Sequence, residues 1–343
     1  MTNNTLTGLS DDEALQAAIG MQEAKKMGFK DLGDPEDFED FIKYLGEVKK
    51  GYKLPFASLT KKFLVAKHEL TLISGYTGLG KSELVNQILL ECIDQGAKGV
   101  ITSLELTSNE LKKRLFQQAT GCANQDRDLA NKFRLHYMGK LKYWDGTKLQ
   151  KLDELLKIME IFYVEHGHTV FVLDNMMMLG ARPGEYEKQY DTVNAIKNFC
   201  KEYPVSVFLV AHPRKPSEKV FVNMKAAQPY EFDTPSIYEV SGSATIGNLV
   251  DNYLAIGQNT VKAHVLNEIE AGRFDRRDCE EFLKYGDVML KRGKKREHGE
   301  FFNLELFFDK NYRRFKESFT EKLFPYVGKS NGQRHQTLED MAA

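Results

Sequence analysis

Short apolar runs alternate with helix-periodic segments along most of this sequence. Runs rich in β-branched and aromatic residues occur at 68–74, 99–104, 169–174, 205–211, 252–257, 287–291 and 301–309. Between the first four runs, apolar residues recur with the spacing that places them on one face of a helix. Strands that alternate with helices predict an α/β fold with a mostly parallel sheet and helices on both faces. A short turn containing Gly299 joins the last two runs, so we expect an antiparallel β-hairpin there.

The N-terminal part of the chain follows a different pattern. Ser10 and Glu13 form a capping box ahead of a helix that we expect to end near Gly28. A second helix is expected to begin at Asp34–Pro35, where an N-cap residue precedes a proline in the first turn. Residues 51–55 are interpreted as a linker. The predicted organisation is a helical appendage or linker-helix region at 1–55, an α/β core at 56–317 and a flexible polar tail at 318–343.

Composition and charge narrow the class of protein. The 343 residues include 48 Lys and Arg and 49 Asp and Glu, which gives a net charge of −1. This balance argues against a generally basic DNA-coating protein, but it allows positive charge confined to one channel. The sequence shows no apolar run near the ~20 residues of a membrane span, and we expect neither a secretory signal nor a transit peptide. The four cysteines lack CxxC spacing, which favours free thiols in a reducing compartment. We therefore expect a cytoplasmic protein. A phage protein that acts in the cytoplasm of its host would also fit.

The strongest chemical signal is the segment from Gly75 to Ser82, which matches G-x-x-x-x-G-K-[ST] in full. An apolar strand precedes it and an amphipathic helix follows, so its amides and the helix N-terminus would surround a phosphate group. Lys81 is expected to reach the β- and γ-phosphates of ATP, and the Ser82 hydroxyl to bind Mg²⁺. The predicted nucleotide-binding residues are Gly75, Tyr76, Thr77, Gly78, Leu79, Gly80, Lys81 and Ser82.

Three further polar residues follow predicted strands. Asp174 ends an apolar strand, as the Mg²⁺-binding Asp of P-loop NTPases does. Glu105 follows the strand after the P-loop helix and could activate the attacking water, but an acidic residue that stabilises the next helix start is an equally good interpretation. His212 follows the fourth strand, within reach of a γ-phosphate, although a lone histidine is more often a surface or core residue.

Two basic clusters also have two interpretations each. Arg214, Lys215 and Lys219 lie in a loop that is either solvated or binds nucleic acid. The segment at 291–296, which contains Lys294 and Arg296, is either a charged strand edge that prevents aggregation or a source of cations for a neighbouring subunit's ATP.

Taken together, these segments resemble the RecA-like motor of hexameric replicative DNA helicases of the DnaB and Twinkle type (superfamily four). The resemblance runs in order over residues 56–317, through SGYTGLGKSE, SLELTSNEL, VFVLDNMMML, VFLVAHPRKP, a GSA…DN segment and K-x-R-x-x-G-[DE]. It implies that Glu105 activates water and that His212 senses the phosphate. It also implies that Lys294 and Arg296 reach a neighbour's γ-phosphate, and that Gly242 and Ser243 lie near the DNA loops.

The resemblance further implies an ATP-dependent DNA helicase that moves 5′ to 3′ on single-stranded DNA during replication, as a homo-hexamer with possible primase or polymerase partners. The sequence departs from the family in several places. We expect no N-terminal primase or collar domain, Val240-Ser241 replaces an arginine, and the segments at 216–238 and 258–286 are long. A RecA-like recombination mediator that binds single-stranded DNA without unwinding it is one alternative, and a small-molecule kinase is another.

Overall fold

The computed structural model describes residues 22–23, 26–27, 42, 50–103, 105–144, 151–176, 185–213, 230–240, 244–296 and 299–328. The chain divides into two compact units, Met1–Lys49 and Lys50–Ala343. Almost all described residues belong to the second unit. The two helices predicted within residues 10–48 therefore lie outside the described residues, apart from isolated positions.

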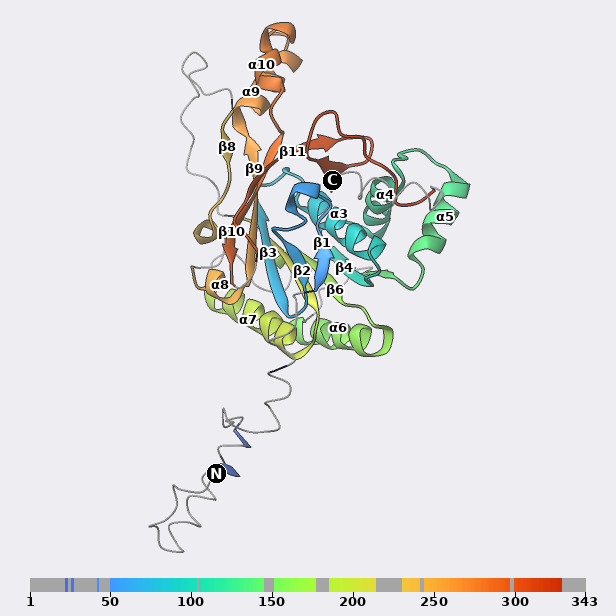
Figure 1. Ribbon diagram of the computed structural model, residues 1–343, viewed down its shortest axis with the longest axis vertical. Coiled ribbons are helices and arrows are strands. Elements are labelled where there is room, and N and C mark those ends of the chain that lie inside the picture. The colour runs from blue at the N-terminus through green and yellow to red at the C-terminus, as the bar shows by residue number, and fades with distance from the viewer. Residues whose placement is uncertain are drawn as a thin grey trace, which may run out of the picture. The chain divides into compact units, whose positions relative to one another are not determined.

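A single large sheet forms the centre of the second unit (Figure 1). Its strand order is β12-β11-β10-β9-β3-β7-β6-β4-β5, and β8 pairs with β9. The bounds are β3 Glu69–Gly75, β4 Gly99–Ser103, β5 Leu141–Tyr143, β6 Val170–Asp174, β7 Ser206–Ala211, β8 Phe232–Asp233, β9 Asn252–Asn259, β10 Val288–Lys295, β11 Asn303–Asp309 and β12 Arg314–Lys316. From β9 to β5 the neighbouring strands are parallel, and β10, β11 and β12 continue the sheet antiparallel. The predicted α/β fold is confirmed.

Helices cover both faces of this sheet, as Figure 1 shows. The α-helices are α3 Lys81–Asp94, α4 Ser108–Thr120, α5 Arg127–Tyr137, α6 Leu152–His166, α7 Tyr186–Glu202, α8 Ala244–Leu249, α9 Thr260–Glu270 and α10 Glu280–Leu283. Shorter 3-10 turns occur at Ala57–Leu59, Ile237–Glu239 and Arg277–Cys279.

The strand β6 illustrates how the central sheet is buried on both of its faces. Val170 and Val172 pack into one core with α3 and α4, and Phe171 and Leu173 pack into a second core with α6 and α7. Successive side chains of a strand point to opposite faces, so a strand buried on both faces is apolar throughout. The only polar side chain of β6, that of Asp174, is consequently left at the strand's carboxyl end.

The C-terminal hairpin forms as predicted, because β10 and β11 pair antiparallel and Gly299, between them, has a φ of 84°. Two other expectations are wrong. Residues 51–53 of the expected linker form β1 (Gly51–Lys53), which pairs with β2 (Leu64–Ala66). The expected loose tail is packed as far as 328, because the amides of Tyr326 and Val327 donate to the Ala119 carbonyl and both side chains are buried.

None of the helices within the described ranges combines the length and the apolar composition needed to cross a bilayer.

Candidate nucleotide-binding site

The predicted phosphate-binding loop connects β3 to α3. Gly75 must be a glycine because a Cβ atom there would lie 2.4 Å from Ile256 Cγ2 on the neighbouring strand β9. Gly80, the N-cap of α3, has a left-handed φ of 83° that favours glycine. The amide groups in the first turn of a helix have no carbonyl partner within the helix, so those of α3 can bind an anion. Lys81 lies across the loop and donates from Nζ to the Tyr76 carbonyl at 3.0 Å.

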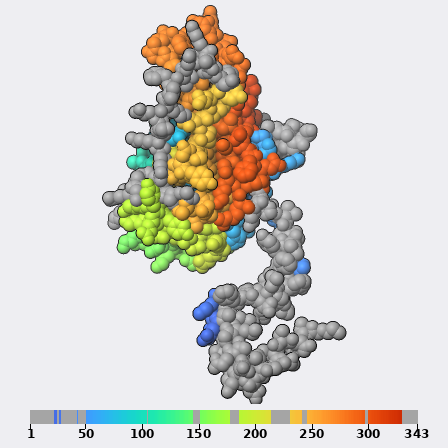
Figure 2. Space-filling model, turned by 90° about the vertical axis from the view of Figure 1, so that its left-hand side faces the viewer, coloured from blue at the N-terminus to red at the C-terminus, as the bar shows by residue number. Residues whose placement is uncertain are grey.

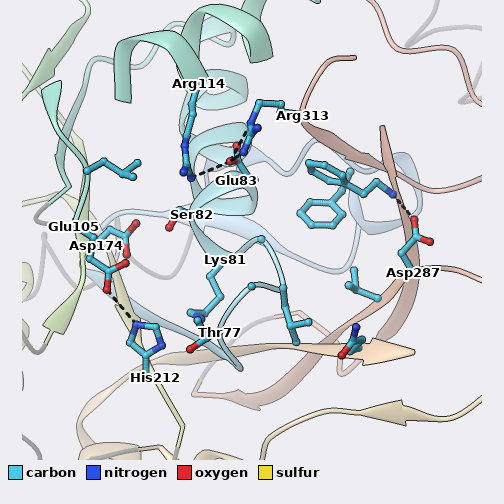
Figure 3. Close-up of a pocket in the computed structure, with 18 residues that line it drawn as sticks. Thr77, Lys81, Ser82, Glu83, Glu105, Arg114, Asp174, His212, Asp287 and Arg313 are labelled. Carbon is cyan, nitrogen blue, oxygen red and sulfur yellow. Dashed lines mark hydrogen bonds and ion pairs between the residues drawn. The ribbon is translucent and has the colours of Figure 1, made fainter. Parts of the chain in front are cut away.

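This loop forms one wall of a cleft of about 460 Å³ (Figure 3). Three predicted polar side chains line the same cleft, namely Glu105, Asp174 and His212. They follow or end β4, β6 and β7, whose carboxyl ends meet at one edge of the sheet because the strands are parallel. The structure thus brings together Thr77 of the loop and His212, which are 135 positions apart, at the edge where open α/β sheets bind their ligands.

Opposite charges are buried side by side in this cleft. Lys81 is 6% exposed and Asp174 4% exposed. Burial lowers the pKa of Lys81, although Asp174 and Glu105 oppose the shift. Burial likewise raises the pKa of Asp174, while a hydrogen bond from Ser82 and the charge of Lys81 oppose it. The Ser82 hydroxyl and the Asp174 carboxylate are thus adjacent oxygen donors, and oxygen donors of this kind suit Mg²⁺.

Glu105 and His212 face each other, and a third residue joins them. The distance from His212 Nε2 to Glu105 Oε1 is 3.4 Å. The Asn175 amide donates to Glu105 Oε1 and lies 3.2 Å from His212 Nε2. Sequence reasoning missed Asn175, although its position directly after Asp174 could have revealed it.

Glu105 does not take part in the cap of the next helix. Helix α4 is capped by a different pair, because Thr107 and Glu110 form the reciprocal capping box. The Thr107 amide donates to Glu110 Oε2 at 2.9 Å, and the Glu110 amide donates to Thr107 Oγ1 at 3.3 Å. Glu105 lies outside this box, and about half of its side chain is exposed towards the cleft, where a water molecule can reach it.

Comparisons with known proteins agree with this geometry. Residues 55–218 match the model of an AAA domain. The chloroplastic/mitochondrial Twinkle homolog protein of Arabidopsis thaliana is 25% identical over 232 residues, which are 61% of this chain and 30% of that protein. This chain therefore spans less than a third of the length of that relative.

Two solved structures have the same fold. A DnaB-like replicative helicase, described with its interactions with primase, superposes with a TM-score of 0.62 at 15% identity, covering 88% of this chain and 74% of that one. A second solved structure, described as an ATPase domain, superposes with a TM-score of 0.61 at 14% identity, covering 84% of this chain and 99% of that one. This chain has the fold of these two ATPase structures, and its residues 55–218 match an AAA domain. The family resemblance seen in the sequence is confirmed.

The cleft also contains a charged cluster that sequence reasoning missed. Glu83, with a side chain 5% exposed, accepts from Arg114 Nη1 at 3.1 Å and from Arg313 Nε at 3.1 Å. Gln118 Nε2 also donates to Glu83 Oε2 at 3.0 Å. One carboxylate therefore connects α3, α4 and the turn before β12 (Figure 3). Glu83 follows Ser82 directly, but nothing in the sequence links it to an arginine 230 residues away.

Lys294 and Arg296 do not line the cleft of their own chain. Because β10 runs antiparallel to β9, Val288 lies opposite Gln258 at the cleft end, while Lys294 lies opposite Tyr253 at the other end. Lys294 Nζ instead donates to the Gly247 carbonyl, and Arg296 Nη2 donates to the Asn248 carbonyl at 2.7 Å.

The predicted DNA-binding residues Arg214, Lys215, Lys219, Gly242 and Ser243 lie outside the described residues. Their flanks are described. The 214–229 segment follows directly on His212 and Pro213, after β7, and the 241–243 segment directly precedes α8.

Proposed function

We propose that this chain is an ATP-dependent DNA helicase that translocates on single-stranded DNA, 5′ to 3′, during replication. The observation that carries the proposal is the convergence of Lys81, Ser82, Asp174 and Glu105 on one cleft of a helicase-type RecA-like domain. The sequence similarity to a protein named as a Twinkle homolog supports the same function.

Each cleft residue has a role that follows from its chemistry. Lys81 and the loop amides bind the phosphates, and Ser82 and Asp174 hold Mg²⁺, which neutralises the developing charge of phosphoryl transfer. Glu105 accepts a proton from the attacking water, as a half-exposed carboxylate at this position can. Asn175 holds Glu105 and His212 next to each other. His212 can therefore respond to the same γ-phosphate that the water activated by Glu105 attacks.

Movement on DNA follows from the position of His212. The segment with Arg214, Lys215 and Lys219 begins directly after Pro213, so a shift of His212 displaces it. We propose that these residues, with Gly242 and Ser243, contact the phosphates of single-stranded DNA. Contacts to phosphates are sequence-independent, and the logarithm of affinity falls by about 0.7 per contacted phosphate with the logarithm of salt concentration.

The proposal requires several subunits. Lys294 and Arg296 lie at the end of β10 away from their own cleft, so they act on the ATP of a neighbouring copy. A closed ring, a homo-hexamer in this family, gives every cleft such a neighbour. A primase or polymerase is the expected partner of a replicative ring. The described cysteines Cys92, Cys122, Cys200 and Cys279 are free thiols, which fits action in the cytoplasm.

ATPase rates with and without single-stranded DNA, combined with strand displacement on a forked duplex, test this function. The proposal predicts DNA-stimulated ATPase activity and unwinding of a fork with a free 5′ tail. Stimulation without unwinding would instead indicate a recombination mediator. ATP turnover that DNA does not stimulate would contradict both and favour a small-molecule kinase.

A further inference from the structure

Asp251 immediately precedes β9, at the end of the sheet away from the nucleotide cleft. Its side chain is 8% exposed, and its two oxygens have different partners. Oδ2 accepts from the Leu70 amide at 2.8 Å and from Lys197 Nζ at 2.6 Å. Oδ1 faces Arg296, whose Nη1 lies 3.5 Å away. The carboxylate therefore joins the start of β3, helix α7 and the end of β10 (Figure 1).

Two contacts fix the Arg296 guanidinium. Nη1 pairs with the buried Asp251 carboxylate, and Nη2 donates to the Asn248 carbonyl at 2.7 Å. The side chain is still 42% exposed, so it remains accessible to another subunit. An exposed arginine would otherwise sample many rotamers, and a guanidinium held at two points loses less freedom when it binds a phosphate.

Asp251 is also the counter-charge for several cations. Lys197 and Arg296 contact the Asp251 carboxylate directly. Lys294 lies close enough to interact with Asp251 and with both of these cations. Figure 2 shows the face of the molecule on which α7, the segment around β9 and β10 adjoin. Without the charge of Asp251, these cations would repel one another across a partly buried surface.

We infer that Asp251 is a positioning residue for Arg296, which it holds in the orientation that meets the γ-phosphate bound by a neighbouring copy. This inference rests on the proposed function, since Arg296 acts only in trans. Leu70 makes the anchor rigid, because it lies in β3 and the other end of that strand continues into the phosphate-binding loop. The arginine of each subunit is thereby fixed to the strand that carries the subunit's own nucleotide site.

The variant D251N separates positioning from folding. The amide oxygen of asparagine can still accept from the Leu70 amide and from Lys197, whereas its NH₂ group would face the Arg296 donor and repel it. The matched control is E268Q, which makes the same change in the ion pair of Glu268 with Arg273, 2.6 Å apart on α9 and the turn after it. We expect both variants to fold. D251N should lower the thermal midpoint, because the buried Lys197 loses its counter-charge, whereas E268Q should stay close to wild type.

The test is a double-mutant cycle on the DNA-stimulated ATPase activity of the full chain, with D251N, R296A and the double variant. We expect D251N to lower kcat by about 10–100-fold, the cost of a small misplacement of a reacting group. KM for ATP should stay within about twofold, because no group that binds ATP has changed. In the R296A background, D251N should lower kcat no further, and E268Q should match wild type.

Two results would overturn the inference, and they differ from failure of the proposed function. If R296A lowers kcat and D251N lowers it equally in both backgrounds, Asp251 acts independently of Arg296. If R296A lowers kcat and D251N alone does not, Asp251 has no positioning role. If R296A turns over at the wild-type rate, the proposed action in trans is itself wrong. If D251N does not fold, D251E takes its place in the double-mutant cycle with R296A, because it displaces the carboxylate and keeps its charge.

Discussion

The two ends of the central sheet hold their charged groups in different ways. At the cleft end, Lys81 at the start of α3, Asp174 at the end of β6 and Glu105 after β4 face a common space that they do not fill. At the opposite end, Lys294 and Arg296 already contact carbonyl groups and a carboxylate of their own chain. The cleft end is thus prepared for a nucleotide, whereas the opposite end holds cations ready for transfer to a stronger anion.

This difference has a consequence for regulation. Carbonyl groups are weaker partners for a cation than the phosphates of ATP, because a carbonyl is a neutral dipole whereas a phosphate carries a full negative charge. The carbonyls that hold Lys294 and Arg296 belong to α8, which directly follows the proposed DNA-contacting segment 241–243. Under the proposed function, contact with a neighbour's ATP would weaken the bonds of these cations to α8, and this would couple ATP in one subunit to the proposed DNA contact in the next.

The largest expected effect concerns the opposite end. R296A should lower DNA-stimulated kcat by about 10³–10⁵-fold, as loss of an arginine supplied in trans does elsewhere. ATP affinity should change little, since Lys81, Ser82 and the other residues that line the cleft are unaltered. Steady-state ATPase assays and binding of a fluorescent ATP analogue measure the two quantities. The control K291A removes an exposed cation of the same strand and should leave both unchanged. Unchanged turnover by R296A would remove the functional difference between the two ends.

The cleft end should show an effect of the chemical step alone. E105Q should lower kcat by about 10²–10⁴-fold, the usual contribution of a general base, with KM for ATP nearly unchanged. Single-turnover hydrolysis of ATP measures the step. The control E154Q alters an exposed glutamate of α6 and should behave as wild type. A rise in KM without loss of kcat would show instead that Glu105 serves nucleotide binding.

A third prediction concerns the scaffold of the cleft. E83Q should lower the free energy of unfolding by about 1–3 kcal/mol, because it removes the charge that Arg114 and Arg313 share. Urea denaturation followed by circular dichroism measures this quantity. The loss should be smaller for E160Q, whose exposed side chain accepts from the Tyr203 hydroxyl. Equal losses in the two variants would mean that Glu83 does not connect the three elements around it.

The smallest expected effect is a gain in stability. Burial raises the pKa of Asp174, and an acid of this kind stabilises the fold below its ordinary pKa and loses that contribution as pH rises through the raised value. At neutral pH the charged carboxylate is therefore unfavourable for folding. D174N should raise Tm by a few degrees at pH 7 while it abolishes Mg²⁺-dependent turnover.

Differential scanning fluorimetry at neutral and acidic pH measures this gain. The difference in Tm between D174N and wild type should shrink as pH falls, because Asp174 then becomes protonated. D153N, at an exposed position of α6, should leave Tm unchanged at both pH values. A lower Tm for D174N at pH 7 would contradict the account of a carboxylate that folding disfavours.

The sequence predicted those parts of the fold that local patterns determine. The strand expected at 68–74 is found at Glu69–Gly75, and the strand expected at 169–174 at Val170–Asp174, because both are buried on two faces and read as apolar runs. The phosphate-binding loop was evident because its glycines are required by backbone geometry. The order of strands along the chain then placed Glu105 and His212 at the same edge of the sheet.

The remaining features depend on contacts between distant segments. Tyr326 packs because its amide donates to the Ala119 carbonyl and its hydroxyl donates to Glu91 at 2.9 Å. The polar sequence of the tail indicates neither contact. Helix α9 lies in a stretch rich in charge, where the apolar pattern was too weak to predict it. The residues that Arg296 contacts, at 248 and 251, likewise became visible only when strand pairing had placed them.

The central claim is that each nucleotide site is completed by the opposite end of a neighbouring copy, and mixed rings test it most directly. E105Q and R296A should each be almost inactive alone. Where an R296A subunit binds ATP and an E105Q subunit supplies its arginine, the interface is intact. Equimolar mixing should therefore restore about a quarter of the wild-type DNA-stimulated ATPase rate, the share of such interfaces in randomly mixed rings. No recovery on mixing two folded, ring-forming variants would contradict the claim.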